Sequence, residues 1–392
     1  MTDTANRLDW VDMAKGLSIF LVVMMYCAAS IGEDTGQTGL LHWAIAFATP
    51  FRMPEFFLLS GLFLSAVIAR PWKAFADRRI VHYLYFYALW AVIHIAFKVG
   101  LVGMNPVGAL GDMALAIAQP YGVLWFIYML AVLGLITKLV HDWRLPQWAV
   151  LVVVAILQMA PIQTGAHALD QFAEYYVHFY VGYAFAPQLF KLAQWATHNT
   201  AAALVAVLVW ALANAALVFG GGFIMDPVHP MPGYASLPGL HLALALIGSA
   251  ALCLVAALLT RLPWMAWLQW MGSKSLIVYV AFVLPMGIAR IILLKLGLTE
   301  PNLLSLTVLA ASIISPLILW WIAQSVGFGT FLFERPAWAH LPGTYRSAAT
   351  QRLPPQPRQS DAVRRQTGLC IDRNNLGPCL LGRDPPKDPR NS

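Results

Sequence analysis

The chain has 392 residues, of which 59% are hydrophobic and only 11% are charged, and its formal net charge is +7. A soluble domain carries about 25% charged residues, so this composition excludes an ordinary soluble protein and indicates a polytopic membrane protein. Residues 343–392 hold nine Lys/Arg against four Asp/Glu, which is +5 of the net charge. The membrane part is therefore nearly neutral, and no nucleic-acid partner is expected.

Long apolar stretches recur along the chain, each close to the roughly 20 residues that cross a bilayer as a helix. They predict an all-α fold of about ten transmembrane helices, over residues 12–32, 42–69, 80–100, 121–140, 146–163, 171–190, 200–219, 238–260, 272–296 and 303–326. The second stretch contains "TPFRMPE", in which Pro50 and Pro54 break helical hydrogen bonding. We expect an interfacial helix there, followed by a shorter span. No cleavable signal peptide is expected, because a polar leader precedes the first apolar run.

The positions of Lys and Arg predict the orientation of the chain. With a cytoplasmic N-terminus, the inner side collects eleven basic residues, whereas the outer loops near 101–120, 164–170, 220–237 and 297–302 contain none. Both termini are therefore predicted to be cytoplasmic. We predict a transmembrane domain over residues 1–342 and a disordered, basic cytoplasmic tail over 343–392, which is rich in Pro, Arg, Gln and Asp and is expected to touch anionic lipid.

Lys15 and Tyr26 lie on one face of the first predicted span, because eleven residues are close to three helical turns. One interpretation is a polar path from the cytoplasmic surface to the middle of the membrane. The alternative is that Lys15 is a positive-inside anchor and Tyr26 a core aromatic residue with its hydroxyl satisfied by a neighbouring helix.

Arg52 and Glu55 flank Pro54 in the broken second span and are three residues apart, so they could pair across one turn. Charged groups within a bilayer are costly and are functional candidates by default. The pair is either an interfacial ion pair or part of a broken helix that lines a polar cavity open to an extracytoplasmic substrate.

A basic cluster occupies the first cytoplasmic loop, "ARPWKAFADRRIVHY", with Arg70, Lys73, Arg78 and Arg79. Such a cluster either sets topology and attracts anionic lipid, or forms a phosphate site for a donor such as a nucleotide-containing thioester. His82 follows just inside the third span, where a histidine is structural or serves acid–base chemistry.

Three further features of the spans need a reason. Trp125, in "YGVLWFIYML", fits an interfacial aromatic belt. Glu174 and His178 are four residues apart on one helix face, but they lack further ligands, so no metal site is predicted. Arg290, deep in the ninth span, is expected to face the bundle and to have a partner there.

Six segments occur in an order that resembles the acyltransferase-3 family of integral membrane acyltransferases: "RLDWVDMAKGLSIFLVVMMY", "FRMPEFFLLSGLFL", "DRRIVHYLYFYALW", "YGVLWFIYML", "MGSKSLIVYVAF" and "FLFERPAW". The likeness covers roughly residues 7–340. It implies about ten core spans in the cell inner membrane. It also implies transfer of an acyl group, often acetyl, from cytoplasmic acyl-CoA to a hydroxyl of a cell-surface or periplasmic glycan. Acyl-CoA would be a substrate, with no permanently bound cofactor and with membrane lipids as further partners.

The resemblance also implies roles for residues that match the family's motifs. Lys15 aligns with the basic residue of the first span, and Lys15, Arg78 and Arg79 match positions that face the donor. Ser60 belongs to the "MPxFFxxSG" motif and Trp125 to "LWF", and both are expected on the donor site. Arg52 and Glu55 lie in or beside the first of these motifs and are candidates for catalysis.

One departure from the family concerns the catalytic base. Tyr26 stands where the family usually carries a histidine, and Phe282 where many members have another. An imidazole titrates near pH 6.5, whereas a phenol near 10 is almost fully protonated at pH 7. His82 or another group could replace the missing base, or Tyr26 could be a variant of this particular copy. The alternatives are a catalytically impaired member that acts in glycan or lipid binding or export, and a secondary transporter with a broken helix and buried charges.

Overall fold

The computed structural model describes residues 3–103 and 105–344. Regular secondary structure in these residues is entirely helical, apart from an isolated bridge between Ile224 and Met231, so the predicted all-α class is confirmed. The chain divides into two units, Met1–Leu341 and Pro342–Ser392. The first unit is the fold described below. From residue 345 onward, the predicted tail of 343–392 lies outside the described residues.

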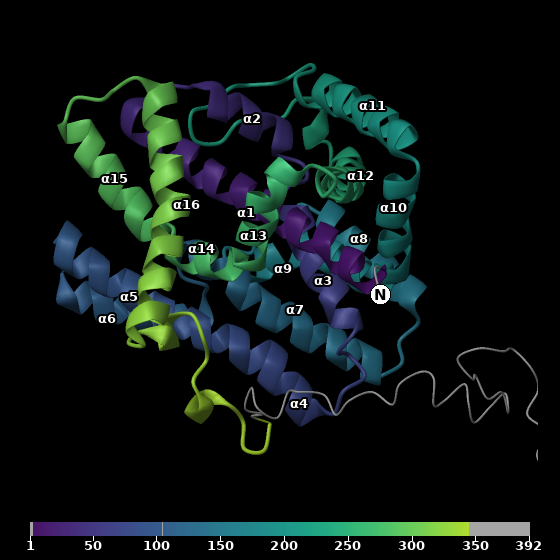
Figure 1. Cartoon of the computed structure of the whole chain (residues 1–392), viewed down its shortest axis with the longest axis horizontal. Helices are drawn as coiled ribbons and strands as arrows, with labels where there is room; N and C mark the ends of the chain where they lie inside the picture. The colour runs from purple at the N-terminus through teal and green to yellow at the C-terminus, as the bar shows by residue number, and fades with distance from the viewer. Residues whose placement is uncertain (1–2, 104, 345–392) are drawn as a thin grey trace, which may run out of the picture. The chain divides into compact units, whose positions relative to one another are not determined.

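The bundle is built from helices that follow one another, mostly with short connections, although the link between α11 and α12 spans 219–237 (Figure 1). In chain order the α-helices are α1 (Asp3–Thr35), α2 (Leu40–Ala48), α3 (Arg52–Ser65), α4 (Trp72–Ala76), α5 (His82–Val102), α6 (Pro106–Ala118), α7 (Trp125–Asp142), α8 (Gln147–Met159), α9 (His167–Ala184), α10 (Ala186–His198), α11 (Thr200–Val218), α12 (Pro238–Leu259), α13 (Ala266–Ser273), α14 (Ser275–Ala281), α15 (Val283–Lys295) and α16 (Pro301–Val326). A π-helix, η1 (Asp77–Val81), joins α4 to α5, and short 3-10 turns are η2 (Gly122–Leu124), η3 (Tyr234–Ser236), η4 (Pro263–Met265), η5 (Thr330–Leu332) and η6 (Ala337–Ala339).

Six helical segments of the described chain are long and apolar enough to cross a bilayer, and the bent pair α14–α15 makes a seventh if it counts as one span. The six are Asp9–Thr35, Trp72–Gly100, Val107–Asp142, Thr200–Val218, Pro238–Leu259 and Pro301–Val326. The multi-pass membrane class is thus confirmed. Every one of the ten predicted spans overlaps at least one helix, but the count of ten and the side of each terminus stay predictions.

The second predicted span is broken where the sequence indicated. Helix α2 ends at Ala48 and α3 begins at Arg52, with Pro50 in the break. Pro54 lies in the first turn of α3, where its missing N–H would have had no helical partner. The break therefore gives α3 its own direction, and most of this helix is buried.

Helix α1 crosses the middle of the bundle and packs against α3, α12, α13 and α16 (Figure 1). The C-terminal end of α1 is linked to α15 through Arg290. The Nε atom of Arg290 lies 3.1 Å from a carboxylate oxygen of Asp34, and its Nη1 donates a hydrogen bond to the carbonyl of Ser30. This ion pair supplies the partner that was expected for Arg290.

Helices α3 and α9 cross at backbone contact. A Cβ atom on Gly61 would lie 2.0 Å from the carbonyl oxygen of Phe179, and a Cβ on Gly182 would lie 2.0 Å from that of Leu58. Small residues permit this approach in membrane bundles, where packing replaces the hydrophobic effect. The pair of glycines therefore fixes the place at which α3 meets α9.

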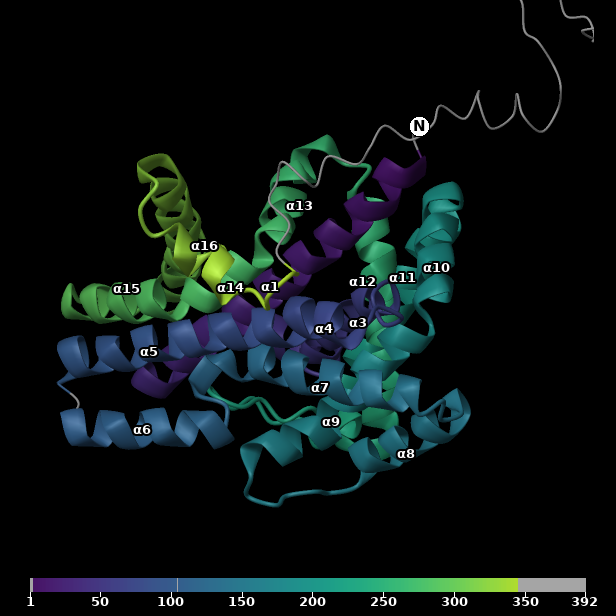
Figure 2. The same cartoon turned by 90° about the horizontal axis from the view of Figure 1, so that it is seen from below.

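The region 101–120, expected to be an outer loop, contains the helix α6, and the side of the membrane on which it lies stays a prediction. Asn105 caps the helix by accepting a hydrogen bond from the N–H of Val107 at 3.0 Å, and Pro106 occupies the first turn. The helix lies beside α5 (Figure 2). Its 13 residues are too few to cross a bilayer alone, and it precedes α7 within the apolar segment Val107–Asp142.

Candidate functional site

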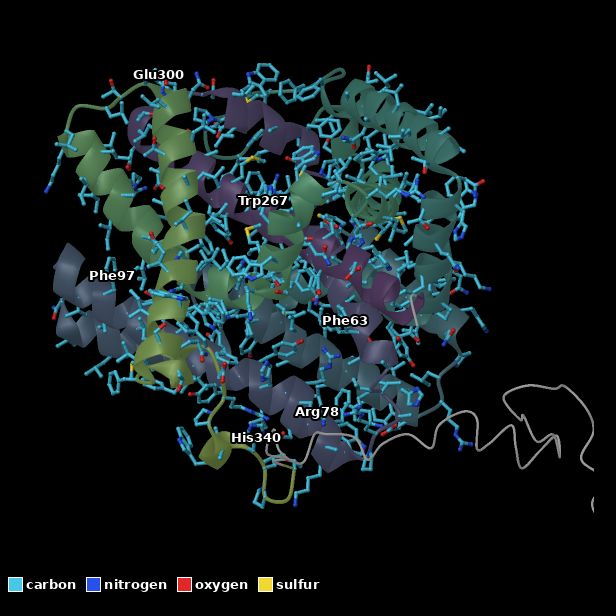
Figure 3. The ribbon with its side chains drawn as sticks, viewed as in Figure 1. Phe63, Arg78, Phe97, Trp267, Glu300 and His340 are labelled. Atoms are coloured by element: carbon cyan, nitrogen blue, oxygen red, sulfur yellow. The ribbon has the colours of Figure 1, made fainter. Side chains whose placement is uncertain are left out.

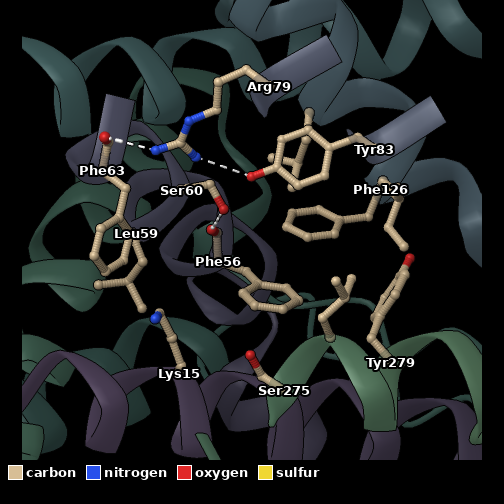
Figure 4. Close-up of a pocket in the computed structure, with 13 residues that line it drawn as sticks. Lys15, Phe56, Leu59, Ser60, Phe63, Arg79, Tyr83, Phe126, Ser275 and Tyr279 are labelled. Carbon is tan, nitrogen blue, oxygen red and sulfur yellow. Dashed lines mark hydrogen bonds between the residues drawn. The ribbon is translucent and has the colours of Figure 1, made fainter. Parts of the chain in front are cut away.

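A cavity of about 320 Å³ opens between α1, α3, α7, α14 and the junction of η1 with α5 (Figure 4). Its walls are mostly aromatic and aliphatic, and its polar groups are two cations and four hydroxyls. The lining residues are Lys15, Phe56, Leu59, Ser60, Phe63, Arg79, Tyr83, Phe126, Ile127, Leu130, Ser275, Leu276 and Tyr279. The cavity therefore brings together Lys15, Ser60 and Arg79, which come from three different segments of the chain. All three were predicted to bind the donor.

The two cations of the cavity enter it from opposite sides (Figure 4). Arg79 donates to the carbonyl oxygen of Phe63 at 2.8 Å and to the hydroxyl of Tyr83 at 3.1 Å. Lys15 lies 4.3 Å from the centre of the Phe63 ring and pairs with Asp12 at 3.1 Å, one turn earlier on α1. No acidic residue occurs among the described side chains that line the cavity. The cavity thus offers positive charge and hydrogen-bond donors to an anion.

An aromatic wall closes the inner end of the cavity. Phe56 and Phe126 stack with ring centres 4.3 Å apart, and Tyr279 lies against the edge of each. The hydroxyl of Tyr279 donates to the carbonyl of Val123, which holds its ring in place. Behind this wall, Phe282 contacts Tyr279, with ring centres 6.2 Å apart. Apolar rings therefore stand between the cations and the middle of the bundle.

Tyr26 lies on the far side of this wall. Its ring packs against Phe282 at 5.5 Å, and its hydroxyl oxygen accepts a hydrogen bond from the indole N–H of Trp125 at 3.1 Å. Tyr175 of α9 stacks obliquely on Trp125, with ring centres 5.4 Å apart. Trp125, predicted to bind the donor, contacts Tyr26 and is not among the residues that line this cavity. Its role at the donor site stays a prediction.

Arg52 and Glu55 do not form the ion pair considered from the sequence; none joins them in the part of the chain that the structure describes. The Nη1 atom of Arg52 instead donates to the carbonyl of Ile45 at 3.2 Å and to the hydroxyl of Thr49 at 2.8 Å. The last carbonyls of a helix lack partners within it, and the break after α2 leaves that of Ile45 available to the guanidinium.

Glu55 is completely buried, and neither of its carboxyl oxygens has a hydrogen-bond partner among the described residues. Ser18 of α1 and Cys253 of α12 are polar neighbours. The hydroxyl of Ser18 donates to the carbonyl of Ala14 at 2.8 Å, and so does not serve the carboxyl group. The catalytic role assigned to Glu55 stays a prediction.

His82 belongs to a different neighbourhood from Tyr26, and no contact joins the two in the described residues. Its ring packs against Tyr83 and Phe86, with ring centres 5.6 and 5.1 Å away. Arg79 and Arg335 are among its charged neighbours. A role for His82 as the missing base is therefore not supported by contact with Tyr26, and it stays a prediction.

The two adjacent arginines of the first cytoplasmic loop differ in placement. Arg79 lines the cavity, whereas Arg78 is exposed at the edge of the bundle (Figure 3). The sequence could not separate them, because both belong to one basic run. Tyr83 and Tyr279 were missed as lining residues. Tyr83 could have been found from its spacing of four residues after Arg79, and Tyr279 from its place in "SLIVY".

Among the described residues, no group of three or more His, Cys, Asp or Glu side chains could hold a metal ion. Comparison with known proteins gives one informative result. A family model described as an acyltransferase domain matches residues 8–323, which is most of the chain and all of the cavity. No curated protein and no solved structure matches the chain significantly.

Proposed function

The chain belongs to the acyltransferase-3 family, and we propose that it transfers an acyl group, with acetyl as the first candidate, from cytoplasmic acyl-CoA to a hydroxyl of an extracytoplasmic carbohydrate. The observation that carries the proposal is the cavity in which Lys15 and Arg79 face each other with no carboxylate on its lining. Two cations and several hydroxyls on a mostly apolar wall suit a ligand that joins phosphates to an apolar arm, which is the chemistry of an acyl-CoA.

The size of the cavity limits how much of the donor it holds. Ligand pockets are typically about 300–1,000 Å³, so a volume of about 320 Å³ accommodates the acyl thioester and its arm but not the whole nucleotide. We place the phosphates near Arg79 and the thioester toward Phe126 and Tyr279. In this pose the thioester points toward the aromatic wall, behind which Tyr26 lies.

The proposal includes a topology of ten spans in the inner membrane with both termini cytoplasmic. The donor comes from the cytoplasm, so the cavity must open there. Arg78 and His340 lie at one edge of the bundle and Glu300 at the opposite edge (Figure 3). This separation agrees with the predicted cytoplasmic loop around Arg78 and the predicted outer loop around Glu300.

In the proposed reaction the acceptor hydroxyl attacks the thioester carbonyl, a C–O bond forms and the C–S bond breaks. The CoA thiolate leaves, and the hydroxyl proton passes to a base. Tyr26 occupies the position of the family's expected histidine, but a neutral phenol is a poor proton acceptor at pH 7. Its oxygen can orient a hydroxyl by hydrogen bonding. We therefore expect transfer by this chain to be slow compared with a variant that carries histidine at residue 26.

A second candidate function follows from the same residue. The oxygen of Tyr26 already accepts the indole N–H of Trp125, and no described carboxylate or imidazole contacts the phenol. A catalytically impaired member that binds or exports a glycan or lipid would have this arrangement. Donor binding separates the two functions, because only the transferase needs acyl-CoA.

The experiment measures glycan acylation in a host deleted for its own enzyme, comparing the chain, Tyr26→His and an empty vector at matched membrane levels. Acyl-CoA binding to the purified protein is measured in parallel. Acylation by either protein supports the transferase, and the ratio of the two rates measures the effect of residue 26. Failure of both proteins to bind acyl-CoA contradicts the transferase and favours the second function.

A further inference from the structure

The segment that follows α16 lies across α5. We call residues 330–341 the C-terminal strap. The hydroxyl of Tyr85 donates to the carbonyl of Phe331 at 2.9 Å, and the indole N–H of Trp90 donates to that of Leu332 at 3.0 Å. The ring of Trp90 also packs on Phe333, with ring centres 5.8 Å apart. The strap is thus bonded along the first half of α5.

The far part of the strap holds Asp77, the first residue of the π-helix η1. Arg335 binds it twice, from Nη2 to a carboxylate oxygen and from Nη1 to the backbone carbonyl, each at 2.7 Å. The other carboxylate oxygen accepts the N–H of Leu341 at 2.8 Å. Nδ1 of His340 lies 3.1 Å from the carboxylate oxygen that Arg335 binds. The side chains of Arg335 and Asp77 are only 4% and 3% exposed. Two donors of one planar guanidinium, bound to the carboxylate and to the backbone carbonyl of the same residue, fix direction as well as distance.

Anchoring Asp77 matters because of the turn that it begins. A π-helix is rare and occurs mostly as a single turn inserted in an α-helix, often at a functional site. Helices α4 and α5 continue on either side of η1, so the turn amounts to one extra residue in an α-helical run. If the turn relaxed to α-helix, the register would slip by one residue, and the side chains on one side of it would rotate by about 100°.

Such a rotation would change which arginine lines the cavity. In the structure Arg79, two residues after Asp77, lines the cavity, and Arg78 is exposed. A slip of one residue in η1 turns Arg79 away from Phe63 and Tyr83, the two residues that orient its guanidinium. The register of η1 therefore decides where the positive charge lies.

We propose that Arg335 and Asp77 are positioning residues for the acyl donor: the C-terminal strap holds the π-helix in register, and thereby keeps Arg79 at the cavity for the donor's phosphates. This inference rests on the proposed function, since the ligand it concerns is acyl-CoA. Neither Arg335 nor Asp77 lines the cavity, so both act through Arg79.

The test is a double-mutant cycle on the full chain in detergent, with the dissociation constant of acetyl-CoA as the readout. Arg79→Gln and Arg335→Gln are each expected to weaken binding about 10-fold or more. The double variant should bind no more weakly than Arg79→Gln alone. Independent, multiplying effects would overturn the inference. Glu334→Gln is the matched control, because Glu334 is next to Arg335 but contacts Gln324 at 2.8 Å; its binding should be unchanged.

Hydrogen exchange supplies a readout that does not depend on the donor. Arg335→Gln should increase exchange in residues 76–84 and leave α9 and α12 unchanged, whereas unchanged exchange in 76–84 would overturn the inference. If Arg335→Gln does not accumulate, Arg335→Lys replaces it, since lysine keeps the charge but loses the fork. Absence of acetyl-CoA binding by the unmodified chain would overturn the proposed function, and the exchange result would still decide the role of the strap.

Discussion

The indole N–H of Trp125 is bonded to the hydroxyl oxygen of Tyr26, 3.1 Å away, and this bond joins α7 to α1 behind the aromatic wall of the cavity. Trp125 is only 7% exposed, so its N–H has little access to other partners. Tyr26 is thus held by a neighbour from a distant segment. A substitution that removes the bonding group of either residue therefore removes the hydrogen bond of both.

We expect the Trp125–Tyr26 bond to appear as a coupling in stability. Tyr26→Phe and Trp125→Phe each remove one partner and keep an aromatic ring. The double variant should be more stable than the sum of the two effects predicts, by about 0.5–1.5 kcal/mol, because the second substitution loses no further bond. Thermal unfolding of the four purified proteins in detergent measures this cycle. Additive effects would show that the bond contributes nothing.

Donor binding should distinguish the two neighbouring arginines. A hydrogen bond to a charged group contributes about 1.5–3 kcal/mol, so Arg79→Gln should raise the dissociation constant of acetyl-CoA roughly 10- to 100-fold. Arg78→Gln changes the same net charge at an exposed side chain, and its effect should stay below about 3-fold. Equal losses in the two variants would mean that the loop attracts the donor by charge alone.

The crossing of α3 and α9 should not tolerate a methyl group. In Gly61→Ala and Gly182→Ala the new Cβ would lie 2.0 Å from a backbone oxygen that no rotamer change can move. Overpacking of this kind costs about 1–3 kcal/mol, and we expect a matching fall in melting temperature for each variant. Gly134→Ala on α7 is the control, because nothing lies within 4 Å of its Cβ; it should melt at the same temperature or higher.

The start of α16 should depend on pH through Glu300. Its carboxylate accepts the backbone N–H groups of Leu303 and Asn302, and these bonds lower the pKa of Glu300 below its ordinary value. A lowered pKa means that the added stability is complete above about pH 4.3 and is lost as the pH falls through the lowered value. The melting temperatures of the chain and of Glu300→Gln should therefore differ at pH 7 and converge in acid. A difference that persists at the lowest pH would exclude the charge as its cause.

The sequence was informative where one residue type dictates the local backbone. Pro50 and Pro54 cannot donate the hydrogen bonds of a continuous helix, and the second span breaks between Ala48 and Arg52 as predicted. The apolar runs also located the long helices, because a bilayer imposes their length and composition. Helix α6 escaped the same reasoning, since it is too short to cross and is recognisable only by its cap at Asn105.

Contacts between distant segments could not be predicted from spacing. Arg52 and Glu55 are close in sequence, which suggested a pair, but the carbonyl of Ile45 at the end of α2 offers Arg52 an acceptor instead. Asp77 and Arg335 are 258 residues apart and nothing in either segment points to the other. Lys15, Ser60 and Arg79 could be assigned to one site only through the family's motifs, and their meeting at one cavity depends on how three helices pack.

The close crossing with α9 fixes the position of α3 at Gly61, so any tilt of α3 would pivot about this residue. Backbone in contact with backbone leaves no side chain there to repack, so a sliding movement of α3 would meet the backbone of α9. Phe63 is two residues from Gly61, or about 3 Å along the axis of α3, whereas Arg52 is nine residues away, or about 13 Å. A tilt that displaced Arg52 by an ångström would therefore move Phe63 by about a quarter of that, and Phe56, five residues from Gly61, by about half. The cavity wall at Phe63 would thus move least, and the end of α3 at Arg52 would move most.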